Sequence, residues 1–494
     1  MIRDSMEGAQ MTTAVRSLVG GRWRDGCGAA RTSVNPARPG EVVAEFSAAG
    51  DQDAEDAIAA ANAAAHAWAR TPIHERAAVL RRAADLLDAR AEPVGTELTR
   101  EEGKTRPEGI AEVRRAAEIL RFQADEANRD AGEIYASPRR EERILVVRKP
   151  LGVVAIVTPW NFPIAIPAWK IAPALVHGNC VVWKPASLVP LLAYRFAEAL
   201  VEAGLPAGVL SLLLGPGSTG SYLARHPGVA AVSFTGSTEI GTELMVTCAG
   251  LRKPVQTEMG GKNAAVVLAD ADLDVAAEQI VLGAMRSTGQ KCTATSRLIV
   301  EEPVSDDLLA RVRRRLDGLN VGDPLLEETD MGPAASLDAR DSIFAGIDGA
   351  VADGAEVLTG GRRFADERAD AAFVPPTLLR LSSTGPAVWR EEVFGPVLSA
   401  VTAASADEAF ALANDSAFGL AASVFTEDLG RAMRAVDECA VGVLHVNSET
   451  AGADPHVPFG GVKDSGSGPK EQGRAAREFF THTTTVYLRP GART

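Results

Sequence analysis

The sequence predicts an α/β fold in which helices cover parallel sheets, and three observations lead to this class. From residue 151 onward, short apolar runs such as VVAIVT and CVVWKP alternate with helical segments. Strands separated by single helices form βαβ units, whose parallel sheet is covered on both faces. A second series of this kind begins near Glu258. Because 494 residues exceed what one hydrophobic core normally holds, we expect two or three domains.

The individual elements follow from the spacing of apolar residues. Before residue 151, apolar residues recur at three and four positions, which predicts helices at 53–70, 75–104 and 112–127. For the first sheet we expect the strands VVAIVT, CVVWKP, VLSLLLG, VAAVSFTG and PVQTEMGG, with helices at about 164–177, 190–203, 218–226 and 238–248. For the second we expect NAAVVL, SRLIVEE, VLSAVTA, AASVFTE and VGVLHVN, with helices at 272–286 and 306–318.

Two segments outside these series also predict strands. The arginine-rich stretch SPRREERILVVRKP (137–150) centres on a short strand with a polar flank. The tail THTTTVYLRP (481–490) alternates β-forming residues and has no partner strand nearby in the sequence. We therefore expect the tail to pair with a distant segment.

Composition and charge exclude several classes of function. The chain carries 51 basic and 65 acidic side chains, a net charge of −14, which argues against nucleic acid or an anionic membrane as a partner. The first residues, MIRDSMEGAQMTTAVRS, lack the apolar segment of a secretory signal, and no apolar run approaches a membrane span. Five scattered cysteines predict reduced thiols in a cytoplasm, and no Cys/His group has the spacing of a metal site.

Two glycine-rich stretches are candidate phosphate sites. GPGSTG (215–220) follows an apolar run and spells the dinucleotide fingerprint, in which Gly217 would approach the pyrophosphate, but Pro216 occupies the tight turn. It can equally be a turn that does not touch a ligand. FTGSTEIG (234–241) follows a predicted strand and opens a helix, so that backbone N–H groups can meet a phosphate.

Within FTGSTEIG, three residues are expected at the cofactor. Phe234 ends the strand, Gly236 permits close approach of the backbone, and Ser237 offers a hydroxyl. The alternative is a plain helix start capped by Ser237 or Thr238.

Cys292 stands alone in the small, polar run STGQKCTATSR, and its role depends on four other stretches. In chain order the five are TPWNFP (158–163), WKPAS (183–187), TEMGGKN (257–263), GQKCTA (289–294) and REEVFGPV (390–397). The order and the residues of these five stretches resemble the motifs of the aldehyde dehydrogenase superfamily, and the resemblance extends over nearly the whole chain from about residue 17. It implies a Rossmann-type cofactor domain, an α/β catalytic domain and a small β extension for oligomerisation.

The resemblance implies three catalytic roles. Cys292 is the nucleophile that forms a thiohemiacetal and then a thioester. Asn161, with the Cys292 backbone N–H, stabilises the oxyanion, and Glu258 is the base that activates the hydrolytic water. Taken singly, these residues could instead be a core cysteine, a turn asparagine and a surface glutamate.

The resemblance also implies a nicotinamide cofactor. Lys184 and Glu392 would bind its ribose groups, Phe394 would pack near the nicotinamide, and Trp160 would line the cleft; a solvated lysine, a surface acid and core aromatics are the alternatives. Where many NAD-preferring relatives have a glutamate after KPA, this chain has Ser187. Without that carboxylate nothing repels a 2′-phosphate, so we expect NAD or NADP, with NADP at least tolerated.

For the substrate, the resemblance implies an anionic semialdehyde. Arg286 lies six residues before Cys292, where succinate-semialdehyde dehydrogenases have a carboxylate-binding arginine, but at the place of their second arginine this chain has Trp169. The segments 450–480, 159–175 and 288–297 are similar to the 2-oxoglutarate-semialdehyde (2,5-dioxopentanoate) dehydrogenase branch, in which an aromatic residue is expected in place of Arg286.

Three further residues are expected around the substrate. His456 and Phe459 would line its mouth, and Arg115 would meet an anion from the opposite side, although each arginine can also be a solvated helix charge. The substrate could also be succinate semialdehyde or a phosphonate-bearing aldehyde. Two other functions stay open: a CoA-acylating relative, against which Glu258 argues, and a non-catalytic binding or structural member of the family.

The expected domains are discontinuous in sequence. The cofactor-binding domain takes 17–136 and 150–257, the catalytic domain 258–477, and the oligomerisation extension 137–149 and 478–494. We expect a homodimer or homotetramer in which the tail strand adds to a neighbouring subunit's sheet.

Overall fold

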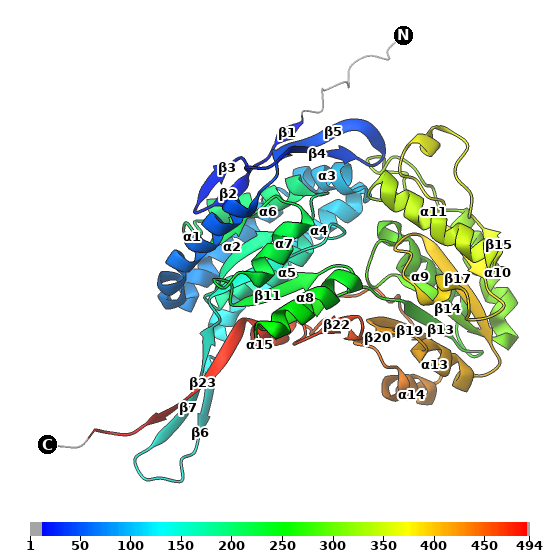
Figure 1. Cartoon of the computed structure of the whole chain (residues 1–494). Helices are drawn as coiled ribbons and strands as arrows, with labels where there is room; N and C mark the ends of the chain where they lie inside the picture. Colours follow the sequence, from blue (N-terminus) through cyan, green and yellow to red (C-terminus); the bar gives the residue numbers. More distant parts are fainter. Residues whose placement is uncertain (1–11, 492–494) are drawn as a thin grey trace.

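The computed structural model describes residues 12–491, so most of the N-terminal segment examined for a secretory signal lies outside the described residues. Two lobes of sheet and helix stand side by side, and a narrow β arm projects from the first of them (Figure 1). Within the described range, no helix combines the length and the hydropathy needed to cross a membrane. Nor do the described residues contain a group of three or more His, Cys, Asp or Glu side chains that could hold a metal.

The first lobe is built on an eight-stranded sheet in the order β22-β12-β11-β8-β9-β10-β2-β3. Its five central strands are parallel and match the predicted ones: β8 (Val153–Val157), β9 (Cys180–Lys184), β10 (Leu210–Leu212), β11 (Ala231–Thr235) and β12 (Val255–Glu258). The predicted helices connect them: α5 (Ala165–Val176), α6 (Pro190–Glu202), α7 (Gly217–Arg225) and α8 (Thr238–Gly250). Strand β8 pairs with both β9 and β11, so the strand order reverses beside it, which is where open α/β sheets bind ligands.

The N-terminal part of this lobe differs from the prediction in two ways. The helix expected over 75–104 is two helices, because the backbone at Arg90 (φ −108°, ψ 12°) leaves the helical path. The four helices here are α1 (Asp51–Arg70), α2 (Ile73–Ala89), α3 (Ala91–Glu102) and α4 (Arg106–Ala124). Strands that were not predicted precede them: β1 (Thr13–Ala14), β2 (Ser17–Val19), β3 (Arg22–Arg24), β4 (Ala30–Asn35) and β5 (Arg38–Ser47).

The second lobe holds a seven-stranded sheet in the order β15-β16-β17-β14-β13-β19-β20. Five strands were predicted: β13 (Asn263–Val267), β14 (Thr295–Glu301), β17 (Val397–Ala403), β19 (Ala421–Phe425) and β20 (Val443–Val446). So were α9 (Leu273–Met285) and α10 (Ser305–Asp317). The prediction missed β15 (Glu356–Thr359), β16 (Thr377–Arg380), α11 (Leu337–Ala352), α12 (Ala387–Arg390), α13 (Ala406–Asn414) and α14 (Leu429–Glu438).

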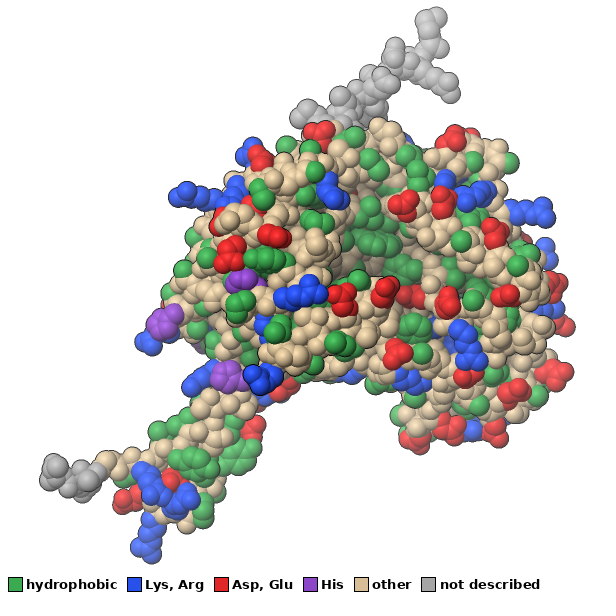
Figure 2. Space-filling view, viewed as in Figure 1, with side chains coloured by type: hydrophobic (Ala, Val, Ile, Leu, Met, Phe, Trp, Pro, Cys, Tyr) green, Lys and Arg blue, Asp and Glu red, His purple; other side chains and the backbone are tan. Residues whose placement is uncertain are grey.

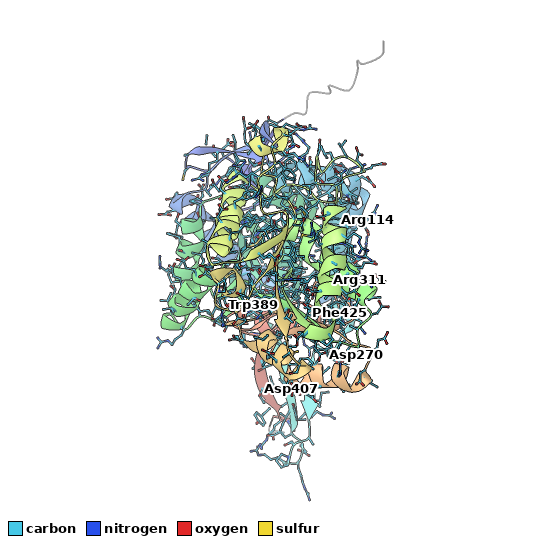
Figure 3. All side chains as sticks on the ribbon, turned by 90° about the vertical axis from the view of Figure 1, so that its right-hand side faces the viewer. Arg114, Asp270, Arg311, Trp389, Asp407 and Phe425 are labelled. Atoms are coloured by element: carbon cyan, nitrogen blue, oxygen red, sulfur yellow. The ribbon has the colours of Figure 1, made fainter. Side chains whose placement is uncertain are left out.

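Helices cover the second sheet on both faces, as its continuous apolar strands require. Along β13, Ala264 and Val266 join one hydrophobic cluster, whereas Ala265 and Val267 join another. Successive strand residues point to opposite faces, so the two clusters are two separate layers of core. Figure 3 views this lobe directly, with Trp389 labelled in the first layer.

The β arm joins the tail to an internal hairpin. Strand β7 (Arg143–Pro150) pairs antiparallel with β6 (Gly132–Tyr135) and, along its whole length, with β23 (Thr481–Leu488). The tail therefore has its partner strand within the same chain, and β23 keeps one unpaired edge. The arm begins at β6, before the expected residue 137, and residues 492–494 of the expected extension lie outside the described part of the chain.

The segment between β20 and the tail bridges the two lobes. It contains β21 (Val462–Lys463), which pairs with β18 (Phe418–Gly419), then β22 (Gly466–Ser467) and α15 (Ala476–Phe480). Strand β22 adds antiparallel to β12, with Gly466 opposite Glu258. A C-terminal segment thus closes over the strand end that carries the expected catalytic glutamate.

Candidate active site

The carboxyl ends of the parallel strands in the first lobe bring the expected site residues to one edge. Thr158 to Asn161 follow β8, Lys184 ends β9, Gly236 and Ser237 follow β11, and Glu258 ends β12. Because parallel strands point the same way, segments far apart in the sequence meet at this edge. The surface is hollowed between the two lobes on the face that carries α7 and α8 (Figure 2).

Cys292 lies in a loop whose backbone is held in an unusual conformation. Ser287, Thr288 and Gly289 just before it have φ values of +54°, +55° and +67°. A side chain at Gly289 would place its Cβ 2.4 Å from the Gly395 carbonyl oxygen, so only glycine fits. Asn263 donates from Nδ2 to the carbonyl oxygens of Cys292 (2.7 Å) and Ala294 (2.9 Å). Backbone strain of this kind persists only where surrounding contacts enforce it, and it is common at active sites.

The sulfur of Cys292 is partly exposed and opens on a cavity of about 350 Å³. Burial raises the pKa of the thiol to about 12, and the nearby carboxylates of Glu392 and Glu258 raise it further in the same direction. With this pKa, the Cys292 thiol is protonated at neutral pH. It therefore needs a base to become a nucleophile.

Glu258 is buried, and it lies near enough to Cys292 for its charge to raise the pKa of the thiol. Its Oε2 accepts a hydrogen bond from the Gly461 N–H at 3.1 Å, and a Cβ at Gly460 would come within 2.2 Å of its Oε1. Burial, with the neighbouring Glu471 charge, raises the pKa of Glu258 well above its usual value. A raised pKa makes the ionised carboxylate a stronger base near neutral pH.

A buried chain of polar groups continues behind Glu258. Lys170 forms an ion pair with Glu471 and donates from Nζ to Ser233 Oγ at 2.9 Å. The Ser233 hydroxyl in turn donates to Gln256 Oε1 at 3.0 Å. Lys170 and Glu471 have at most 2% exposed side chains, so the pair shapes the field at Glu258 in a low-dielectric interior.

Asn161 is held beside the Cys292 loop. Its Nδ2 donates to the Gln290 carbonyl oxygen at 3.0 Å. An amide nitrogen has two N–H donors, so one remains for an oxyanion. The Asn161 carbonyl accepts a hydrogen bond from Lys104, whose Nζ also lies 2.7 Å from Glu112 Oε2. Glu112 accepts the backbone N–H groups of Ile164 and Ala165 at the start of α5, so this buried ion pair fixes the whole 161–165 turn.

On the cofactor side, the helix starts and a free cation suit a dinucleotide. Gly217 is the first residue of α7, and a Cβ there would meet nothing within 4 Å. Ser237 precedes α8 without a side-chain capping bond, and a Cβ at Gly236 would meet Phe234 at 2.5 Å. Both glycine-rich stretches thus open helices, with N–H groups available to a phosphate.

Two more observations support a nicotinamide dinucleotide in this cleft. Burial lowers the pKa of Lys184 to about 8, with no carboxylate acting on it, and Ser187 Oγ donates to the Gly215 carbonyl at 2.8 Å. On the far side, Glu392 accepts the Gly261 N–H at 3.0 Å, and burial raises the pKa of its carboxyl to about 7. These groups provide donors for phosphates and an acceptor for sugar hydroxyls.

Aromatic rings complete the cofactor side. Trp160 and Phe394 meet edge to face, with ring centroids 5.5 Å apart, and Phe394 has a φ of +54°. Phe394 and Glu392 line the same small recess next to Gly261 and Gly289, directly beside the Cys292 loop. The residues present therefore fit a planar, phosphate-bearing group that ends near the sulfur.

On the substrate side, the structure brings together four of the five expected residues. Arg115, Trp169, Arg286 and Phe459 line the cavity in front of Cys292, whereas His456 has an exposed side chain and does not line it. The rings of Trp169 and Phe459 pack with centroids 5.6 Å apart and form an apolar wall.

Both substrate-side arginines already contact acids. Arg115 lies 3.5 Å from Asp454 and 3.3 Å from Glu118, and Arg286 lies 3.2 Å from Glu449. The Arg115 and Arg286 side chains are 37% and 54% exposed, so water weakens each pair and the arginine can exchange its partner for another anion.

Sequence reasoning missed five charged residues that also line the cavity: Lys104, Glu108, Glu112, Lys291 and Glu449. The position of Lys291, directly before the nucleophile in GQKC, was a signal that could have found it. The others lie on α3–α4 and on the loop after β20, and only the tertiary fold brings them to Cys292.

Comparison with known proteins agrees with this geometry. The aldehyde dehydrogenase family model matches residues 23–486. The chain is 41% identical to alpha-ketoglutaric semialdehyde dehydrogenase of Bacillus subtilis over 92% of its length and 94% of the relative's. It is 42% identical to alpha-ketoglutarate semialdehyde dehydrogenase of Haloferax volcanii, covering 97% and 99%. An NAD-dependent aldehyde dehydrogenase from Sinorhizobium meliloti superposes with a TM-score of 0.95 at 34% identity, covering 100% and 98%.

The chain belongs to the aldehyde dehydrogenase family. The fold class expected from the sequence is confirmed, as is the branch that its motifs resemble. Its general activity, NAD(P)-dependent oxidation of an aldehyde, follows from this membership.

Proposed function

We propose that this enzyme oxidises an anionic semialdehyde to the dicarboxylic acid, with 2-oxoglutarate semialdehyde as the favoured substrate. The proposal rests on one observation: Cys292, Arg286 and Arg115 line the same cavity. Guanidinium groups bind carboxylates through paired hydrogen bonds. The names of the relatives from Bacillus subtilis and Haloferax volcanii support the same substrate class.

The chain's residues supply each step of the proposed mechanism. Glu258, once ionised, takes the Cys292 proton directly or through water, and the thiolate adds to the aldehyde carbon. The free Asn161 N–H and the Cys292 backbone N–H hold the resulting oxyanion. A nicotinamide held in the cleft beside Phe394 and Glu392 would supply the hydride acceptor for this carbon. After passing the cysteine proton to solvent, Glu258 removes a proton from water, which attacks the Cys292 thioester, so that the acid is released and the Cys292 thiolate leaves.

We propose NAD as a cofactor and NADP as a tolerated one. Ser187 directs its hydroxyl to Gly215, and no carboxylate acts on Lys184. A 2′-phosphate would meet no repulsion from these two residues. The proposed division of labour places the dinucleotide in the first lobe (17–136 and 150–257) and the nucleophile in the second (258–477).

We propose a homodimer or homotetramer held together by edges that one chain leaves unpaired. Strand β23 has one free edge in the arm, and β20 is the edge strand of the seven-stranded sheet. Leu429, Met433 and Val436 on α14, beside β20 in sequence, are more than half exposed. An exposed strand edge with apolar neighbours favours pairing between subunits. The reduced cysteines and acidic composition support a cytoplasmic location.

A panel of aldehydes tests the substrate proposal. The wild-type enzyme should show its highest kcat/KM on 2-oxoglutarate semialdehyde, followed by succinate semialdehyde, with pentanal far lower. Arg286→Ala should lower kcat/KM for the anionic substrates by about 10- to 100-fold, the usual cost of losing a hydrogen bond to a charged group, and should affect pentanal little. Equal losses for charged and neutral aldehydes would reject an anionic substrate, and CoA-dependent product formation would favour an acylating enzyme.

A further inference from the structure

Glu449 occupies a position between two cations in the substrate cavity. It lies on the loop after β20, and its backbone N–H donates to Gln279 Oε1 at 3.2 Å. Its Oε1 lies 3.2 Å from Arg286 Nη1, and its Oε2 lies 3.8 Å from Lys291 Nζ. The protein thus places a carboxylate of its own on Arg286, where the substrate carboxylate is expected.

The contact between Glu449 and Lys291 is incomplete. The distance of 3.8 Å is too long for a hydrogen bond, and Oε2 of Glu449 is buried without any hydrogen-bond partner. Lys291 itself is only 7% exposed. A buried ammonium and a buried carboxylate that do not satisfy each other carry a large desolvation cost, so the Lys291 N–H groups remain available to a better-placed anion.

The other charged groups facing the cavity are already engaged. Lys104 bonds Glu112 and the Asn161 carbonyl. Glu108 accepts the Ser287 N–H at 2.8 Å. Among the charged residues described around this cavity, Lys291 and Glu449 stand out as a buried pair without a mutual hydrogen bond.

We propose that Lys291 is the second cation, beside Arg286, that binds the substrate carboxylate, and that Glu449 is an internal carboxylate which the substrate displaces. The inference rests on the proposed function and deepens it by assigning specificity to two residues. Lys291 and Cys292 line the same cavity, so a carboxylate held by the ammonium leaves the aldehyde end of the substrate free to reach the sulfur.

The burial of Lys291 gives a physical reason for the protein to keep the Glu449 carboxylate beside it. Burial lowers the pKa of Lys291, and the charges of Glu449 and Glu108 oppose this shift. Glu449 therefore favours the charged form of Lys291 while the cavity holds no substrate. When an anionic aldehyde binds, its carboxylate takes the place of the Glu449 carboxylate beside Lys291 and Arg286. No buried charge is left unpaired, and a neutral aldehyde cannot make this exchange, so the site favours anionic aldehydes.

Inhibition by glutarate, a five-carbon dicarboxylate without an aldehyde, tests the pair directly. Its inhibition constant against pentanal oxidation is measured for the wild type and for Glu449→Gln, Lys291→Met and Glu118→Gln. Glu449→Gln should tighten glutarate by about 10-fold, and Lys291→Met should weaken it by about 10- to 100-fold. Glu118→Gln removes the same charge from the exposed partner of Arg115 and should change it less than about twofold.

Kinetics on charged and neutral aldehydes distinguish the two levels of the proposal. The ratio of kcat/KM for 2-oxoglutarate semialdehyde to that for pentanal should rise in Glu449→Gln and fall in Lys291→Met. If the wild type prefers the anionic substrate but Glu449→Gln leaves both this ratio and glutarate binding unchanged, the internal-carboxylate assignment is overturned alone. If the wild type prefers pentanal, the proposed function itself fails. Should Lys291→Met not fold, the near-isosteric Glu449→Gln still decides the outcome.

Discussion

The cofactor side and the substrate side of Cys292 are built in different ways. On the cofactor side, Lys184, Ser237 and Glu258 are placed by the carboxyl ends of parallel strands of one sheet or by the helix starts that follow them. On the substrate side, Arg115 comes from α4 and Glu449 from a loop more than 300 residues later. The sheet thus fixes the cofactor side. The substrate side is assembled from other elements, whose charged residues could be replaced without altering a strand.

Charged pairs around the substrate cavity differ in how tightly they are held. Arg115 and Asp454 are 37% and 60% exposed at a separation of 3.5 Å, so water screens the pair. Lys104 and Glu112 are at most 3% exposed, lie 2.7 Å apart, and fix the turn that carries Asn161. The difference indicates that the reaction machinery is rigid, while the substrate mouth is adjustable and sets specificity.

The largest effect should follow removal of the nucleophile. Cys292→Ala should lower kcat by about 10⁴-fold or more for every aldehyde, because no other group can form the thioester. Steady-state reduction of NAD measures it. Cys27→Ala removes an exposed thiol as a matched control and should retain wild-type turnover. Activity that survived equally in both variants would contradict covalent catalysis.

The next effect concerns the base. Glu258→Gln should lower kcat by about 10²- to 10⁴-fold. In the wild type kcat should rise with pH as Glu258 loses its proton, at a pH well above the usual range of a glutamate because burial and Glu471 raise its pKa. In the variant this limb should disappear, while any rise caused by the Cys292 thiol at alkaline pH persists. An identical pH profile in both enzymes would assign the base elsewhere.

Breaking the buried ion pair tests the rigidity of the reaction machinery. Lys104→Met leaves the Glu112 carboxylate buried and unpaired, which should lower the free energy of unfolding by about 3–5 kcal/mol. Urea unfolding measures it, and Lys104→Met with Glu112→Gln should recover part of the loss. Replacing the half-exposed Arg115 by Met should cost less than about 1 kcal/mol. Similar costs at the two positions would remove the contrast between the buried pair and the half-exposed pair.

The smallest effect tests cofactor choice. Ser187→Glu places a carboxylate near the site expected for a 2′-phosphate, so like-charge repulsion should lower the ratio of kcat/KM with NADP to that with NAD by about 10-fold or more. Ser187→Ala removes the hydrogen bond to Gly215 without adding charge and serves as the control. A ratio that stayed constant in Ser187→Glu would place the adenosine ribose away from residue 187.

The regular parts of the fold were predictable because their sequence patterns are local. Strands such as β8 and β9 are buried on both faces and read as continuous apolar runs, and the helices between them repeat at three and four positions. The edge strand β15 and strands β1 to β5 were missed, since most of them are short or mix exposed and buried positions and so lack either pattern. Strand β16 is buried but only four residues long.

The site was predictable where a motif carries the chemistry. Cys292, Asn161 and Glu258 lie in stretches whose wording resembles the family, and the fold brings them to one cleft. Glu449 lies in no such stretch, and its proposed role follows only from its distances to Arg286 and Lys291. His456, also expected at the substrate mouth, is exposed and lies outside the lining of the cavity, so its role there stays a prediction.

The most direct test of the account is to trap the acyl group on Cys292. Glu258→Gln is mixed with NAD and excess 2-oxoglutarate semialdehyde, and both NADH release and the intact protein mass are followed. We expect a burst of about one NADH per active site, slower than in the wild type because Cys292 has lost its base, and an acyl adduct that peptide mapping locates on Cys292, because the thioester then persists without an activated water. A burst without an adduct, or an adduct on another residue, would contradict the account.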